Sequence, residues 1–198
     1  MFAHRFACAA ALATATIAIA TSPARAQPTR PPPRVGLELG FGLQAGKIFC
    51  EDQHDSCNDF TEAGGLNLDA AYFVNPTLAI TGDFWVMAHT ENNFTFAHYI
   101  NTVGVKWRPV PILTLQAGVG EAHATIDYNG AFSAQARSNN GFAIMGGAAL
   151  DVLRGRRFAL AIELRAGSGF YGDKNNDGQA DIVGRNVGVG ASLTWFNF

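Results

Sequence analysis

The sequence predicts an all-β protein, an eight-stranded antiparallel up-and-down barrel that spans a membrane. Three observations lead to this fold: an N-terminal export signal, eight segments of alternating hydrophobicity, and connections that differ in length between the two ends. The composition agrees, because only 15% of the 198 residues are charged and 22 are glycines. The 48% apolar content excludes a disordered chain. The absence of a large Lys/Arg cluster excludes a nucleic-acid-binding protein.

The first 26 residues have the pattern of a cleaved signal peptide. A short basic start precedes an apolar stretch over residues 6–21, and Ala24 and Ala26 are the small residues at −3 and −1 of a signal-peptidase site. Cleavage is therefore expected after Ala26. The mature chain would then begin with a proline-rich, extended periplasmic tail, residues 27–33, followed by the barrel over residues 34–198.

Eight segments of the mature chain alternate with the two-residue period of a β-strand. Large apolar residues occupy every second position, and small residues or isolated charges stand between them. These segments are 35–43, 66–72, 78–86, 99–107, 113–119, 142–150, 158–165 and 187–195.

The connections between these segments are expected to differ at the two ends of the barrel. Three are short turns, at 75–76, 109–111 and 153–157, and four are longer polar loops, near 48–64, 88–96, 127–140 and 171–184. Short turns at one end and long loops at the other are typical of outer-membrane barrels.

The two faces of the strands predict that the apolar face meets lipid and the other lines the interior. Six isolated charges lie on the inner face: Glu38, Asp69, Asp83, Lys106, Glu163 and Arg165. Side chains fill an eight-stranded barrel, so these charges are expected to form a paired network without an open pore. A soluble, lipocalin-like periplasmic binder is the alternative, because it would turn the apolar face inward around a ligand.

The chain ends with Thr194-Trp195-Phe196-Asn197-Phe198. With eight strands and this aromatic end, it resembles the small bacterial outer-membrane β-barrels, the OmpA-like and opacity-type group. The resemblance implies a monomer in a Gram-negative outer membrane, in contact with its lipid and lipopolysaccharide. It also implies that Phe198 is the signal for the barrel-assembly machinery. Phe196 and Phe198 lie on the opposite parity from Trp195, so a bulge or a frayed end is expected there.

The same resemblance implies a structural or surface-interaction function, in envelope integrity or adhesion, with no catalytic residue and no required cofactor. Some small barrels edit lipid A, so a lipid A-modifying enzyme is a further alternative. Its candidate nucleophiles and bases would be His123 with Thr125, His89 with Thr90, and Ser133 or Ser138. No His-x-Ser element accompanies them.

Two loops carry motifs of their own. Residues 173–181 follow the pattern D-x-N-x-D-G and offer Ca²⁺ the oxygens of Asp173, Asn175, Asp177, Gln179 (backbone carbonyl) and Asp181. Asp, Asn and Gly are also the usual residues of a plain polar loop. Cys50 and Cys57, the cysteines left after signal removal, predict a small loop disulfide in an oxidising compartment.

Overall fold

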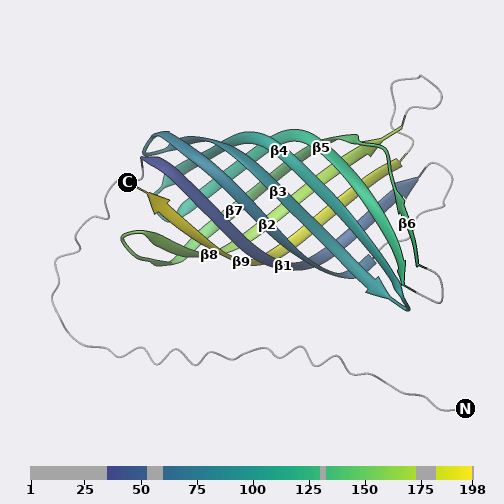
Figure 1. Ribbon diagram of the computed structural model, residues 1–198. Helices are drawn as coiled ribbons and strands as arrows, with labels where there is room; N and C mark the ends of the chain where they lie inside the picture. Colours follow the sequence, from purple (N-terminus) through teal and green to yellow (C-terminus); the bar gives the residue numbers. More distant parts are fainter. Residues whose placement is uncertain (1–34, 53–59, 130–132, 173–181, 198) are drawn as a thin grey trace, which may run out of the picture. The chain divides into compact units, whose positions relative to one another are not determined.

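The computed structural model describes residues 35–52, 60–129, 133–172 and 182–197 (Figure 1). Nine strands are present in these ranges: β1 (Gly36–Asp52), β2 (Phe60–Asn75), β3 (Leu78–Glu91), β4 (Phe94–Val110), β5 (Leu113–Asn129), β6 (Ser133–Arg137), β7 (Gly141–Arg154), β8 (Phe158–Tyr171) and β9 (Ile182–Asn197). Among the described residues, no helix is long and apolar enough to cross a membrane. The signal peptide and the tail lie outside the described residues and stay predictions.

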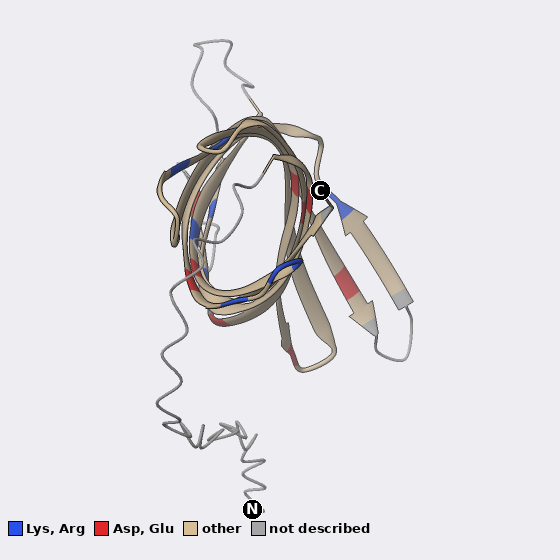
Figure 2. Cartoon of the chain, turned by 90° about the vertical axis from the view of Figure 1, so that its left-hand side faces the viewer, with Lys and Arg blue, Asp and Glu red and all other residues tan. Residues whose placement is uncertain are grey.

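Eight of the strands close into a ring. Each pairs with its chain neighbours in antiparallel fashion, and β1 pairs with β9 along its whole length. Figure 2 shows the closed ring from one end. The predicted eight-stranded antiparallel barrel is therefore confirmed.

The ninth strand, β6, is the outer continuation of β7. Both pair with the same edge of β5, β7 as far as Ala122 and β6 from Thr125 onward. A break over residues 138–140 separates them, where the Ser138 hydroxyl accepts a hydrogen bond from the Ala124 backbone N–H at 2.8 Å. The predicted long loop at 127–140 is thus mostly an extended hairpin.

The strand register defines the tilt of the barrel. A row of paired residues that starts at Leu39 on β1 passes through every barrel strand and returns to β1 at Phe49, ten residues further along. This stagger corresponds to strands tilted by roughly 35–45° from the barrel axis. Rows of paired residues therefore climb diagonally across the wall.

Three tight connections lie at one end of the barrel, here called the turn end: 76–77, 111–112 and 155–157. The Asn75 side-chain oxygen caps the first by accepting hydrogen bonds from the N–H groups of Thr77 and Leu78, both at 2.9 Å. The predicted short turns are confirmed. The opposite end, where the β3–β4 and β5–β6 hairpins end, is called the loop end.

One predicted long loop at the loop end is wrong. Strands β3 and β4 stay paired up to Glu91 and Phe94, so only Asn92 and Asn93 connect them. Both residues have positive φ, 46° and 73°, as a type I′ hairpin turn requires. Asparagine tolerates this left-handed conformation better than other non-glycine residues, which lets the hairpin continue beyond the barrel rim.

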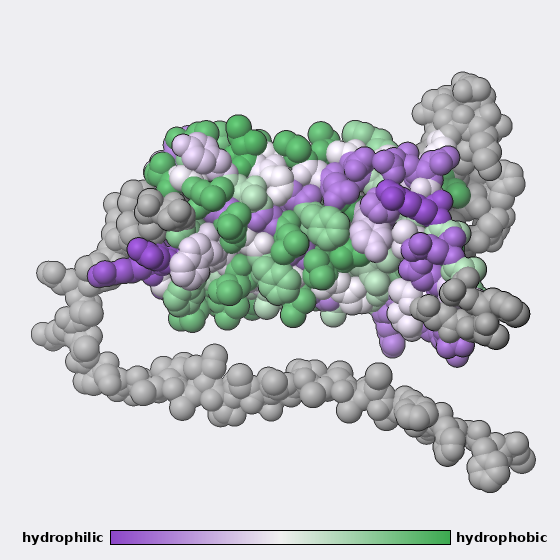
Figure 3. All heavy atoms as spheres, viewed as in Figure 1, coloured by the Kyte–Doolittle hydropathy of each residue, from purple (hydrophilic) through white to green (hydrophobic). Residues whose placement is uncertain are grey.

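The outer surface of the barrel carries an apolar belt. Leu37, Leu39, Phe41 and Leu43 on β1 are all exposed, while the residues between them are covered. Figure 3 shows hydrophobic side chains around the middle of the barrel and hydrophilic ones at the loop end. The aromatic residues Tyr72, Trp107, Phe158 and Trp195 face outward near the turn end. This arrangement suits a lipid-facing exterior and is the inverse of a soluble ligand-binding barrel.

The last strand runs to the turn end without a bulge. Strand β9 keeps a constant register against β1 from Ile182 to Asn197, with Phe196 opposite Glu38. The Phe196 side chain is buried, and its backbone N–H donates to the Arg157 carbonyl at 2.8 Å. The expected bulge or frayed end is therefore wrong as far as Asn197, because the inward parity places Phe196 in the interior. Phe198 lies outside the described residues.

Candidate functional site

The barrel interior is the candidate functional site, because it gathers the polar side chains that the sequence singled out. Alternation along each strand turns every second residue inward. The structure places all six predicted charges there, with buried side chains: Glu38, Asp69, Asp83, Lys106, Glu163 and Arg165.

Lys106 of β4 joins the carboxylates nearest the turn end. Its Nζ lies 3.1 Å from Glu38 Oε1 and also contacts Asp69 Oδ2. Arg108, two residues further along β4, donates to the second oxygen of Glu38 at 2.9 Å and to the Thr114 hydroxyl at 3.1 Å. Its guanidinium also lies over the Phe73 ring, 4.2 Å from the centroid.

Arg165 of β8 joins the next set of carboxylates. It donates to Asp83 Oδ1 at 3.0 Å and to Glu163 Oε1, and one of its nitrogens lies 3.6 Å from Asp69. With its amide oxygen turned toward Arg165, Gln116 also accepts from this guanidinium at 3.1 Å. Asp69 thus links the Lys106 and Arg165 groups into one network.

Neutral side chains extend the network across the barrel. The Gln44 amide donates to Asn67 Oδ1 at 3.1 Å, and the Asn67 amide donates to Glu163 Oε2 at 3.5 Å. On β3, the Thr81 hydroxyl donates to Asp83 Oδ2 at 3.2 Å. Together the ion pairs and hydrogen bonds of the network connect six strands of the wall, β1, β2, β3, β4, β5 and β8. Side-chain bonds between strands inside the barrel restrict changes in the shape of its cross-section.

Glycine makes room for these long side chains. A Cβ at Gly40 would lie 2.2 Å from Asp69 Oδ1, so only glycine lets Asp69 reach Lys106 and Arg165 at this point. Gly40 on β1 thus makes room for the charged side chain of its paired neighbour on β2.

Arg108 is a member of the network that the sequence pattern did not single out. It lies on the same parity as Lys106, so alternation alone was sufficient to find it. The expected strand ended at Trp107 and the expected turn began at Pro109, so Arg108 was assigned to neither, whereas the strand extends to Val110. The described network therefore contains three cations and four carboxylates.

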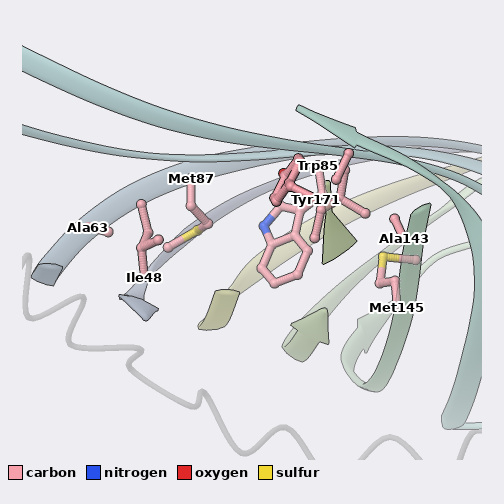
Figure 4. Close-up of a cluster of buried hydrophobic side chains, with 9 residues drawn as sticks. Ile48, Ala63, Trp85, Met87, Ala143, Met145 and Tyr171 are labelled. Carbon is pink, nitrogen blue, oxygen red and sulfur yellow. The ribbon is translucent and has the colours of Figure 1, made fainter. Parts of the chain in front are cut away.

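An apolar cluster covers the network on its loop-end side (Figure 4). Toward the loop end, the next inward residue after Asp83 on β3 is Trp85, and the next inward residue after Thr102 on β4 is Ile100. The buried members are Ile48, Ala63, Trp85, Met87, Ile100, Ala122, Ala143, Met145 and Tyr171. Charge and apolar bulk thus occupy successive layers along the barrel axis.

A buried polar group lies at the loop-end edge of this cluster. The His98 imidazole contacts Asn186 Oδ1 through Nδ1 at 2.8 Å and the Tyr171 hydroxyl through Nε2 at 2.5 Å. An Nδ1-protonated, neutral His98 satisfies both contacts, because Nδ1 then donates and Nε2 accepts from the hydroxyl. The group ties β4, β8 and β9 together.

The residues considered for catalysis do not form a nucleophile–base pair that the structure records. His123 faces outward and stacks on Tyr99, with ring centroids 4.6 Å apart. Within the part of the chain that the structure describes, its Nδ1 and the Thr125 hydroxyl both lack a hydrogen-bond partner, so they do not bond each other. Among the described residues, the Ser138 hydroxyl accepts from the Ala124 N–H and donates to the Asn139 carbonyl, and the Thr90 hydroxyl contacts that of Thr95 at 3.1 Å.

Several predicted sites include residues outside the described ranges. The candidate calcium ligands Asp173, Asn175, Asp177, Gln179 and Asp181 lie outside the described residues, as does Cys57, the predicted partner of Cys50 on β1. Within the described ranges, no group of three or more His, Cys, Asp or Glu residues is arranged to hold a metal ion.

Comparison with known proteins supports the fold and not a particular activity. No family model matches the chain, and no curated protein is similar to it in sequence. Ail, the attachment invasion locus protein of Yersinia pestis, has a TM-score of 0.57 at 15% identity, covering 81% of this chain and 99% of that one. Neisserial surface protein A has a TM-score of 0.55 at 11% identity, covering 82% of this chain and 97% of that one.

Both of these similar proteins are small eight-stranded outer-membrane barrels. At this level of identity the likeness concerns the fold, and it agrees with the ring closure, the register and the apolar belt. The chain is a closed, eight-stranded transmembrane β-barrel of the outer-membrane type.

Proposed function

We propose that this protein is a structural barrel of the outer membrane that does not conduct ions and that makes its external contacts at the loop end. The observation that carries the proposal is the filled interior. Ion pairs among Glu38, Asp69, Asp83, Lys106, Arg108, Glu163 and Arg165 occupy the turn-end half, and the apolar cluster around Trp85 covers them.

Both layers oppose the passage of ions. A hydrated ion would have to separate buried charge pairs, which costs several kcal/mol per uncompensated charge. It would also have to pass Trp85, Met87 and Ile100, which are fully buried and offer no replacement for its water shell. The layers act in series, so each alone is sufficient to block a path.

Planar bilayer recording tests this proposal. The refolded wild-type protein is expected to give no ohmic conductance, and Trp85→Ala/Met145→Ala, which empties the apolar layer, is expected to remain silent because the ion pairs still close the path. Trp195→Ala, on the outer surface, is the matched control. Steady ohmic steps from the wild-type protein would contradict a closed interior.

The loop end is the part of the barrel suited to contacts with other molecules. Paired strands β3 to β6 continue there, and Phe94 and Ile126 are about half exposed. They line a pocket of about 450 Å³ with His89, Glu91, Asn92 and Phe96. Ail, similar in fold, is named for attachment and invasion, so adhesion is the contact to test first.

An adhesion assay compares cells that display the wild-type protein with cells that display Phe94→Ser/Ile126→Ser. Loss of attachment to matrix-coated surfaces is expected for the variant, at equal surface abundance. Tyr72→Ser, at the turn end, is the control. Equal attachment by both variants would remove the loop-end pocket from the proposal.

Three further parts of the proposal involve residues outside the described ranges, the second of them together with Cys50 on β1. The Asp173–Asp181 segment is proposed as a Ca²⁺-binding outer loop, Cys50 and Cys57 as a disulfide, and Phe198 as the signal for the barrel-assembly machinery. The protein is proposed to act as a monomer in contact with lipopolysaccharide.

A further inference from the structure

A groove of about 890 Å³ crosses the lipid-facing surface of β1 to β5. Its floor is formed by Ala70 and Gly82, which are paired neighbours on β2 and β3. Leu39 and Val103 continue the same row on either side. A Cβ at Gly82 would meet no atom within 4 Å, so the floor is open space.

The groove lies within the apolar belt. On β4, Val103 of the lining stands midway between the outward-facing Trp107 toward the turn end and Tyr99 toward the loop end. Leu68 and Phe84 form its wall on the loop-end side. In a membrane this surface faces hydrocarbon, so an acyl chain is the occupant that the lining accepts.

The direction of the groove selects one end for the head of the lipid. The next row of paired residues toward the loop end runs from Leu68 through Phe84 and Asn101 to Glu121. Because rows climb diagonally, the Glu121 end is the end nearer the loop-end surface of the membrane. The Asn140 amide holds the Glu121 carboxylate by a hydrogen bond of 3.1 Å to Oε2.

The Glu121 carboxylate at the head of this acyl groove only accepts hydrogen bonds, so it favours a hydrogen-bond donor next to the chain. An ester-linked chain has no donor there, whereas an amide-linked chain carries an N–H at its first atom. We propose that this groove binds an amide-linked acyl chain of a lipid A molecule, whose N–H donates to Glu121. The inference rests on the proposed outer-membrane location and adds a lipid site to it.

Native mass spectrometry of the detergent-folded mature protein with added lipid A tests the groove. The wild-type barrel is expected to retain one lipid A molecule, and Gly82→Leu, which fills the floor, is expected to retain about tenfold less. Ala191→Leu, an outward substitution on β9 away from the groove, is the control. Ala70→Leu serves as a second floor variant if Gly82→Leu fails to fold.

Glu121→Leu tests the role of the donor. The wild type is expected to prefer lipid A over phosphatidylglycerol of matched chain length, and Glu121→Leu is expected to bind the two equally. An unchanged preference, or equal lipid retention by Gly82→Leu and Ala191→Leu, would overturn the site. Folding of each variant is checked separately on a gel. A folded wild-type barrel that retains no lipid disproves the groove alone, whereas a wild-type chain that forms no barrel disproves the proposed function.

Discussion

Lys106 illustrates how single residues hold this barrel together. Its ammonium group is buried between Glu38 and Asp69, which come from two other strands. Burial of an isolated charge is very costly, so each member of the network depends on its partners. Removal of one cation therefore leaves more than one buried carboxylate with fewer ion-pair partners.

The variant Lys106→Met is expected to lower the free energy of unfolding by about 3 kcal/mol, because it leaves two buried carboxylates short of a partner. Urea unfolding in lipid vesicles, followed by tryptophan fluorescence, measures the change. Lys47→Met, at an exposed position on β1, is the control and is expected to change stability by less than about 0.5 kcal/mol. Equal effects of the two substitutions would contradict the network.

Two glycines on neighbouring parts of the wall are expected to respond differently to the same change. A Cβ at Gly40 would collide with Asp69, whereas a Cβ at Gly82 meets open space on the outer surface. Gly40→Ala is therefore expected to cost about 1–3 kcal/mol. Gly82→Ala is expected to be neutral or stabilising by up to about 1 kcal/mol. The same unfolding assay separates them, and a larger loss for Gly82→Ala would be inconsistent with the packing described.

At the scale of elements, the β3–β4 hairpin shows where sequence reasoning was misled. Polar residues around Asn92 and Asn93 indicated a long loop, because loops and turns share the same composition. The alternation of apolar and polar residues weakens near the tip, because side chains there face neither lipid nor the barrel interior. The pairing of two flanking strands is a tertiary property that local polarity does not report.

The hairpin turn makes a prediction at Asn93, whose φ is 73°. A β-branched residue is strained there, so Asn93→Val is expected to destabilise the hairpin by about 1–2 kcal/mol, whereas Asn93→Gly is tolerated. Amide hydrogen exchange at Glu91 and Phe94 reports the local opening. Unchanged protection in Asn93→Val would show that this turn does not hold the strand ends.

The Asp173–Asp181 segment makes a prediction about calcium. If its oxygens bind the ion, Ca²⁺ should protect the segment from protease, and chelation or Asp177→Ala should abolish that protection. Limited proteolysis with and without Ca²⁺ measures it, with Asp127→Ala on β5 as an acidic control outside the motif. Equal Ca²⁺-dependent protection in the wild type and in Asp177→Ala would contradict a calcium site and identify the segment as a plain polar loop.

At the scale of the whole molecule, alternation predicted much of the fold from the sequence. It identified eight strands, the three short turns and six interior charges, because each inward position must meet either a partner or a small residue. It did not predict which charges pair, since Asp69 joins Lys106 and Arg165 only through the stagger of the ring. The opposite parity of Phe196 and Trp195 predicted a bulge or a frayed end, whereas the regular strand turns the Phe196 ring into the interior at the turn end.

Closure of the ring with lipid outside is the central feature of this protein, and a heat-modifiability gel of mature residues 27–198 folded in detergent tests it directly. Every strand edge of a closed barrel is paired, so the unboiled protein is expected to resist SDS and to migrate differently from the boiled sample. A single mobility before and after boiling, together with a soluble monomer obtained without detergent, would contradict the account.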